Sequence, residues 1–248
     1  MWSNLATRTA CLLVTSRLFC SLVSAQYTQN SSSIFLQGGT VISFNRATSS
    51  LEVLRNSSVL ISGDRIVSVG ETGTASTLPP NTEIVNLTPS HIISPGFIDT
   101  HRHGWQTAFR SIDSNTSLAE YFARYGQYAA AGKLTPEDAH IGQLAGLYSA
   151  LDAGVTTTLD FSHATWSPEH ATAVLNACVE SGARVFWTYA TQLLPDTFPI
   201  QDQYKDLRRL VEENVGDWEQ SPTEIGLAYD QFESAPIDEI RQAIDLVR

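Results

Sequence analysis

Cysteine is scarce in this chain of 248 residues, and the cysteines that are present form no recognisable pattern. They are Cys11, Cys20 and Cys178. Three scattered cysteines supply neither a disulfide framework nor a cysteine-rich metal motif. Long apolar runs are absent too, because none reaches the roughly 20 residues that a membrane-spanning helix needs. The sequence therefore predicts a protein without a disulfide scaffold and without a membrane span.

Basic residues are also few. The chain has 15 Lys and Arg against 26 Asp and Glu, which gives a net charge of −11. A surface that binds nucleic acid or an anionic membrane needs an excess of basic residues, so both classes of partner are disfavoured. The apolar content of 42% is ordinary for a globular protein.

The first 25 residues differ from the rest, because no acidic residue occurs before Glu52. Two apolar runs and the small-residue sequence Val23-Ser24-Ala25 predict a secretory signal peptide over 1–25. Arg17 interrupts the apolar region, so mitochondrial and cytoplasmic locations stay open beside the favoured secretory pathway. Sequons consistent with a glycoprotein begin at Asn30, Asn56, Asn86 and Asn115.

Residues 26–91 contain short β-type runs separated by glycine and proline turns. The sequence Ser62-Gly63-Asp64-Arg65 is typical of a tight hairpin. Short strands at this spacing predict a small β-sandwich. The expected strands cover 34–36, 40–44, 58–62, 65–69 and 83–87.

From Ile92 onward, apolar strand-like runs alternate with amphipathic helical stretches, which is typical of a parallel α/β fold. Thr135 and Pro136 fit the N-cap and first position of a helix, and Gly154 fits its C-terminal end. Residues 92–248 are thus predicted to form four βα units. The expected strands are 92–98, 155–161, 183–189 and 224–229, and the expected helices are 117–131, 136–153, 168–181, 201–214 and 236–248.

The strongest chemical signal is the sequence His101-Arg102-His103 at the end of the first predicted strand. Residues i and i+2 of a strand face the same side, so the two imidazoles can bind one divalent metal ion. A metal with open positions activates water near neutral pH. A bare pair of histidines also occurs by chance, but the preceding apolar strand favours a metal site.

Several segments together resemble the amidohydrolase superfamily, and within it the branch of deaminases and s-triazine chlorohydrolases. The pattern His-x-His-x-x-Gln-x-x-x-Arg begins at His101. The resemblance covers about residues 34–248 and continues through 134–138, 154–160 and 167–171.

The resemblance implies a (β/α)8 barrel, a small-molecule substrate and one divalent metal ion, zinc or iron. It implies that His101 and His103 are metal ligands, while Asp99 is expected to orient them through hydrogen bonds. For His163, a substrate contact and a makeshift third ligand both stay open. Trp105 fits either stacking on a flat heterocycle or packing in a loop. The residues expected to contact substrate are Trp105, Gln106, Arg110 and His163.

Four βα units are half of such a barrel. In the family, the remaining ligands and the acid/base histidine follow strands five, six and eight, so no catalytic residue is identifiable here. The favoured function is hydrolysis of a non-peptide C–N bond, by deamination or amide hydrolysis, with little activity expected of this chain alone. The alternatives are a non-catalytic half-barrel and one half of a split enzyme. A homodimer or a complementary chain would then cover the open edge of the sheet.

Overall fold

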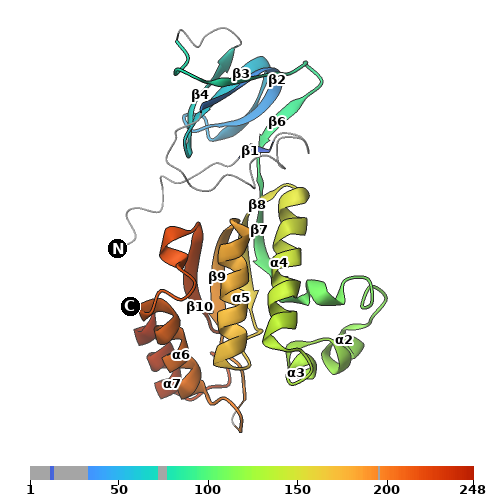
Figure 1. Cartoon of the computed structure of the whole chain (residues 1–248), viewed down its shortest axis with the longest axis vertical. Helices are drawn as coiled ribbons and strands as arrows, with labels where there is room; N and C mark the ends of the chain where they lie inside the picture. Colours follow the sequence, from blue (N-terminus) through green and yellow to red (C-terminus); the bar gives the residue numbers. More distant parts are fainter. Residues whose placement is uncertain (1–11, 14–32, 72–76, 195) are drawn as a thin grey trace. The chain divides into compact units, whose positions relative to one another are not determined.

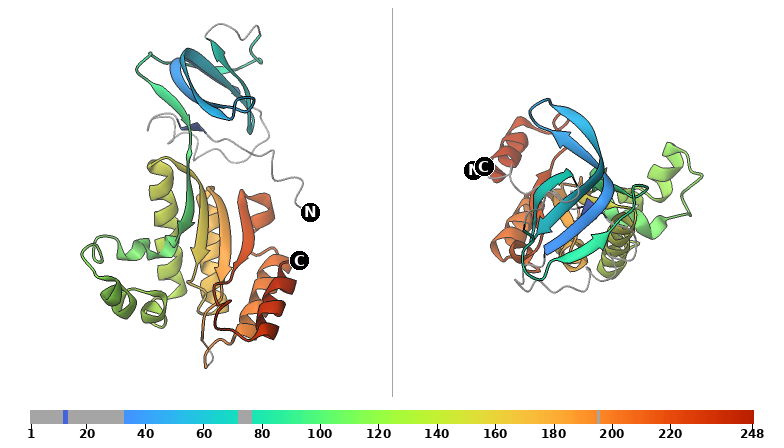
Figure 2. Two further views of the ribbon diagram at one scale, coloured as in Figure 1. Left: turned by 180° about the vertical axis from the view of Figure 1, so that it is seen from behind. Right: turned by 90° about the horizontal axis from the view of Figure 1, so that it is seen from above.

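The computed structural model describes residues 12–13, 33–71, 77–194 and 196–248. The chain forms two compact units, residues 1–97 and 98–248, which follow each other in sequence (Figures 1 and 2). The first unit ends after Phe97, and the predicted division into 26–91 and 92–248 stays a prediction. The leader predicted over 1–25 lies outside the described residues, except for Leu12 and Leu13.

The described part of unit 1 is one mixed sheet with the strand order β1-β6-β2-β3-β4, and β5 pairs with β2. The predicted hairpin is confirmed, because Ser62 pairs with Arg65 across the turn. A small core consists of Leu36, Val41, Val59 and Ile93. The strands are β1 (Leu12–Leu13), β2 (Ser33–Asn45), β3 (Ser50–Ser62), β4 (Arg65–Glu71), β5 (Glu83–Asn86) and β6 (Ile92–Pro95).

Two predictions about these strands were wrong. The runs 34–36 and 40–44 belong to one strand, β2, because Gly38 adopts a φ of +91° and absorbs a register shift between Leu36 and Gly39. A glycine at such a bulge bends the strand without ending it. Strand β3 also begins at Ser50, well before the predicted residue 58. A sandwich needs two sheets and the described residues of unit 1 supply one, so the sandwich stays a prediction.

The strand predicted over 92–98 is interrupted at Gly96. Strand β6 (Ile92–Pro95) belongs to the sheet of unit 1, whereas β7 (Phe97–Arg102) belongs to the sheet of unit 2. Proline has no N–H to donate to a sheet, so Pro95 is a natural strand end. As a result His101 lies within β7 and His103 directly follows it.

Unit 2 is an α/β structure with the strand order β10-β9-β8-β7, in which β8, β9 and β10 pair in parallel. This confirms the predicted class of fold. The other strands are β8 (Val155–Ser162), β9 (Arg184–Ala190) and β10 (Thr223–Ala228). The helices are η2 (Gly104–Phe109), α2 (Leu118–Arg124), α3 (Gln127–Ala130), α4 (Pro136–Asp152), α5 (Pro168–Ser181), α6 (Ile200–Glu212), η3 (Trp218–Gln220) and α7 (Ile237–Leu246).

The helix predicted over 117–131 is instead two short helices, α2 and α3, which Tyr125 and Gly126 separate. The short helix η2 was not predicted. By contrast, α4 and α5 begin at the predicted residues, Pro136 and Pro168, and the predicted N-cap of α4 is confirmed. Thr135 and Asp138 form a reciprocal capping box, and Ser167 accepts a hydrogen bond from the backbone N–H of His170.

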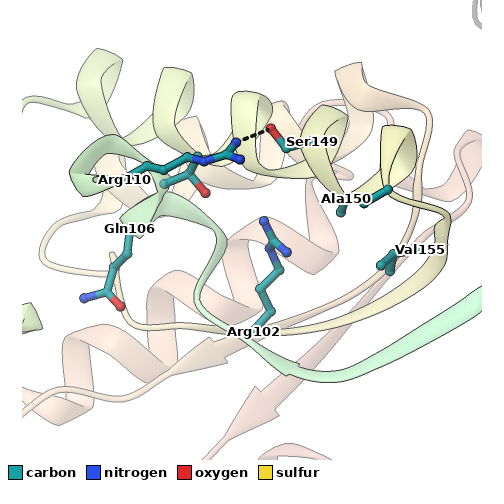
Figure 3. A pocket seen from close by; sticks show the side chains of 8 residues that line it. Arg102, Gln106, Arg110, Ser149, Ala150 and Val155 are labelled. Carbon is teal, nitrogen blue, oxygen red and sulfur yellow. Dashed lines mark hydrogen bonds between the residues drawn. The ribbon is translucent and has the colours of Figure 1, made fainter. Parts of the chain in front are cut away.

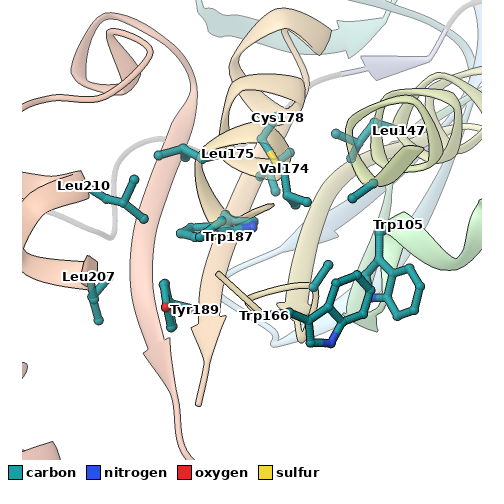
Figure 4. Packing of buried hydrophobic residues seen from close by; sticks show 14 of the residues in the cluster. Trp105, Leu147, Trp166, Val174, Leu175, Cys178, Trp187, Tyr189, Leu207 and Leu210 are labelled. Atoms are coloured by element: carbon teal, nitrogen blue, oxygen red, sulfur yellow. The ribbon is translucent and has the colours of Figure 1, made fainter. Parts of the chain in front are cut away.

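The helices of unit 2 pack against one face of its sheet. Alternate residues of β8, from Thr156 to Ser162, are buried on that face, while Leu159 on the other face is 36% exposed. The largest fully buried side chains of the core include Trp105 and Trp187 (Figure 4). The opposite face of the strands is in view in the left panel of Figure 2. Within the described ranges, no helix combines the length and the apolarity that crossing a membrane requires.

Candidate metal site at the end of strand β7

Three histidines lie together where β7 and β8 end. The ring centroids of His101 and His103 are 4.9 Å apart, and those of His103 and His163 are 4.0 Å apart. His101 and His103 come from the β7 end, and His163 directly follows β8. The structure therefore brings the two predicted ligands and the third predicted site histidine into one cluster.

The hydrogen bond of His103 determines which of its nitrogens is free. Nδ1 of His103 lies 2.7 Å from the carbonyl oxygen of Phe161, which can only accept. Nδ1 therefore carries the proton, and Nε2 keeps a free lone pair. Metal-binding histidines in proteins are typically held in this way, by a backbone carbonyl that accepts from the other ring nitrogen. Burial lowers the pKa of His103, which favours the neutral form that binds metals.

His163 has the opposite tautomer. The indole Nε1–H of Trp105 donates to Nδ1 of His163 over 3.0 Å, and indole can only donate. The proton of neutral His163 is consequently on Nε2. Burial, followed by repulsion from His103 and His101, lowers the pKa of His163 to about 3. In this state Nε2 of His163 carries an N–H group and no free lone pair, so it can donate a hydrogen bond but cannot bind a metal.

The tautomers show which of the three histidines could bind a metal ion. His103 has the tautomer that a ligand needs, and His101 lies beside it. His163 could join them only by losing its bond to Trp105. In the part of the chain that the structure describes, no group of three His, Cys, Asp or Glu residues could hold a metal. His101 and His103 thus fit two positions of a ligand set, whereas catalytic zinc sites normally use three protein ligands.

Asp99 supports the backbone of this site. Its Oδ1 accepts from the backbone N–H of His101 at 3.3 Å, and its Oδ2 lies 3.5 Å from Nη1 of Arg102. The hydrogen bond is to the main chain of His101 and not to its ring. The role of Asp99 in orienting the imidazoles therefore stays a prediction.

Asp160 is a site residue that the sequence analysis did not single out. Its Oδ1 accepts from the backbone N–H of Gly104 at 2.9 Å, and its Oδ2 accepts from Nε2 of Gln143 at 2.7 Å. Burial raises the pKa of Asp160 to about 6, against the opposing effect of these hydrogen bonds. Because Gly104 follows His103, Asp160 anchors the chain directly after the proposed ligand. The sequence does contain a signal that could have identified Asp160, because it is the one charged residue in the strand 155–162.

Of the remaining predicted substrate contacts, Trp105 contacts His163, whereas Gln106 and Arg110 lie in another place. Trp105 is fully buried, with its ring edge-on to Phe109 and Trp166. Gln106 donates to the hydroxyl of Tyr121 and, with Arg110, lines a separate cavity. Contacts of these three side chains with a substrate stay predictions.

The chain is similar to a known protein family and to several of its relatives. The sequence profile described as the amidohydrolase family matches residues 92–241. A 5-methylthioadenosine/S-adenosylhomocysteine deaminase of Thermococcus kodakarensis is 28% identical over 73% of this chain and 38% of its own length. The corresponding deaminase of Symbiobacterium thermophilum is 30% identical over 61% of this chain and 32% of its own length.

Solved structures show the same fold. The zinc complex of atrazine chlorohydrolase TrzN from Arthrobacter aurescens superimposes with a TM-score of 0.64 at 20% identity, over 86% of this chain and 51% of that one. Guanine deaminase from C. acetobutylicum, with guanine bound, has a TM-score of 0.65 at 17% identity, over 87% of this chain and 51% of that one.

Unit 2 is thus a parallel α/β structure with a candidate metal site at the end of its first strand. The match to the amidohydrolase profile covers more than half of the sequence. The chain belongs to the amidohydrolase family. It spans about a third of the length of the curated relatives that it matches and about half of the structural neighbours.

Proposed function

We propose that this chain contributes the first part of the active site of a metal-dependent hydrolase that deaminates a small nitrogen heterocycle. Family membership supports hydrolysis of non-peptide C–N bonds in general, and the deaminases among its relatives support deamination. The observation that carries the proposal is the bond from Nδ1 of His103 to the carbonyl of Phe161. It leaves Nε2 free for one zinc or iron ion.

We further propose that unit 2 corresponds to the first four βα units of a (β/α)8 barrel. Its strands follow one another in sequence order across the sheet. The two histidines come from the carboxyl end of the first of them, which is where active sites of such barrels lie. The structural neighbours support this interpretation, because each is matched over about half of its own length.

Each of the site residues of this chain would have a different role in the reaction. His101 and His103 would bind the ion, which when bound would act as a Lewis acid toward water and substrate. Asp160 and Asp99 hold the backbone at Gly104 and His101, on either side of the site. His163 keeps its proton on Nε2 and would donate it as a hydrogen bond to a ring nitrogen or carbonyl of the substrate.

One observation favours a second candidate function. The described residues contain no three-ligand group, so a chain without further ligands would be a non-catalytic half-barrel or one half of a split enzyme. In either case a second copy or a complementary chain would cover the edge strands β7 and β10.

Zinc and cobalt titration of the purified full chain tests the first proposal. We expect weak binding of one ion per chain, in the range of a two-ligand site, together with the ligand-field bands of cobalt. The variants His101→Ala and His103→Ala should each abolish it. His91→Ala removes an exposed histidine of unit 1 and should have no effect.

Ammonia release in the presence of zinc, with adenine and guanine nucleosides and bases as substrates, separates the two candidates. Turnover that His103→Ala abolishes supports the hydrolase. Zinc binding without turnover supports a chain that needs a partner. Binding that survives both histidine variants would refute the metal site itself.

A further inference from the structure

A cavity lies in unit 2 between η2 and the C-terminal half of α4. Its volume is about 360 Å³, which is within the range of small-molecule sites. Figure 3 shows the guanidinium groups of Arg102 and Arg110 entering the same space. The cavity is lined by Arg102, Gln106, Thr107, Arg110, Ser149, Ala150, Ala153 and Val155.

The polar lining of this cavity is rich in donors. Two arginines and two hydroxyl residues line it, and no aspartate or glutamate does. Arg110 is exposed and donates from Nη1 to Oγ of Ser149 at 3.3 Å, and within the described ranges no carboxylate forms an ion pair with it. A guanidinium has five N–H donors, so most of those of Arg110 are available.

Arg102 is held in place from the other side. Its Nη2 donates to the carbonyl of Gly146 at 2.9 Å, and its Nη1 lies near Asp99. Its Nε is buried and has no partner within the described part of the chain. The orientation of Arg102 is thus set before any ligand arrives.

We propose that this cavity is a binding site for a small organic anion, a carboxylate or a phosphate monoester. The planar fork of arginine matches both groups and binds them through paired N–H donors. The apolar side chains of Ala150, Ala153 and Val155 suit a short hydrocarbon portion of the same ligand. The net charge of the protein is −11, so most of its surface repels anions. The two arginines make this cavity locally positive and able to attract them.

The site is distinct from the histidine cluster, because no histidine lines it. The proposal consequently does not rest on the proposed hydrolase function. It also changes the expected role of Gln106 and Arg110, whose place is in this cavity rather than beside the metal ligands.

Calorimetric titration of the full chain with inorganic phosphate and with butyrate tests the site. We expect saturable binding of at least one of the two, with one site per chain. Arg110→Met should weaken it at least tenfold, or by at least about 1.4 kcal/mol, because the variant removes the charged partner of the anion. Arg241→Met is the matched control, since Arg241 is exposed on α7 and pairs with Asp238; it should bind as the wild type does.

Two further variants make the result decisive. Ser149→Ala removes one hydroxyl without changing the charge and should weaken binding by a few fold. His103→Ala should leave it unchanged, even where it abolishes metal binding. The proposal is overturned if neither anion binds saturably, if Arg110→Met and Ser149→Ala bind as tightly as the wild type, or if His103→Ala removes anion binding.

Discussion

At the residue scale, single contacts give two neighbouring histidines different chemical roles. A carbonyl acceptor leaves a lone pair on His103, whereas an indole donor leaves an N–H on His163. Each partner lies 58 positions away in sequence. The sequence motif could predict that His101 and His103 share a site. It could not predict the tautomers, because these depend on contacts that only the folded chain creates.

Asp160 gives a prediction about stability and pH. Its pKa in the folded protein, about 6, is above the ordinary value of 3.8. Between these values the folded state binds more protons than the unfolded state, so lowering the pH favours folding through this group. We expect the wild type to gain roughly 2 kcal/mol relative to Asp160→Asn between pH 7.5 and 4.5. Chemical denaturation of both proteins at several pH values, with a chelator present, measures the difference.

The comparison with Asp160→Asn is needed because two histidines have the opposite effect on stability over the same pH range. The pKa values of His103 and His163 are lowered in the folded protein, so lowering the pH disfavours folding through these groups. Their contribution is common to both proteins and cancels. Asparagine can keep both hydrogen bonds, since Oε1 of Gln143 has no partner and can turn toward the new amide. A difference that stays constant between pH 7.5 and 4.5 would show that Asp160 does not titrate there.

At the scale of elements, glycines allow α4 to pack closely against η2. A Cβ atom at Gly146 would lie 2.6 Å from Oγ1 of Thr107 and 2.8 Å from the carbonyl oxygen of Gly104. A Cβ at Gly142 would collide with the carbonyl oxygen of Trp105. This contact places η2, and with it Trp105, against the helix that also carries Gln143.

We expect Gly142→Ala to destabilise the protein by about 2 kcal/mol, in the range of overpacked cores. At an exposed helix position, alanine would stabilise the protein by about 1 kcal/mol relative to glycine. A loss of stability in Gly142→Ala would therefore come from the close contact with η2 and not from helix propensity. Thermal and urea denaturation measure the change.

Gly226→Ala is the control for this substitution, because its Cβ would meet Thr188 at an ordinary 3.4 Å. We expect it to cost much less than Gly142→Ala. Equal stability of the two variants, or a more stable Gly142→Ala, would mean that α4 and η2 are not in this close contact.

The elements that could be predicted were those with local signals. The starts of α4 and α5 follow from side chains that cap within one helical turn. The break at Gly96 and the continuity of β2 across Gly38 depend instead on which sheet each residue joins. Such pairing is a tertiary property, and a glycine in the sequence is equally compatible with a turn and with a bulge.

At the scale of the whole molecule, the sheet of unit 2 has two distinct faces. Helices cover one, and on the other Leu159 is 36% exposed beside the partly buried Phe161 and Phe186. The edge strands β7 and β10 each have one side without a strand partner among the described residues. Exposed apolar sheet surface and open edges favour association with another chain. The leader and the secretory location stay predictions.

We therefore expect the purified chain to self-associate through this face, with an average mass in sedimentation velocity that rises with protein concentration. Leu159→Lys should shift the protein toward the monomer, because a buried lysine in the contact would lose hydration without a partner. Ile141→Lys adds the same charge on the outer side of α4, where Ile141 is 56% exposed, and should leave association unchanged. A chain that stays monomeric at all concentrations, or two variants that dissociate equally, would show that this face of the sheet is not the contact.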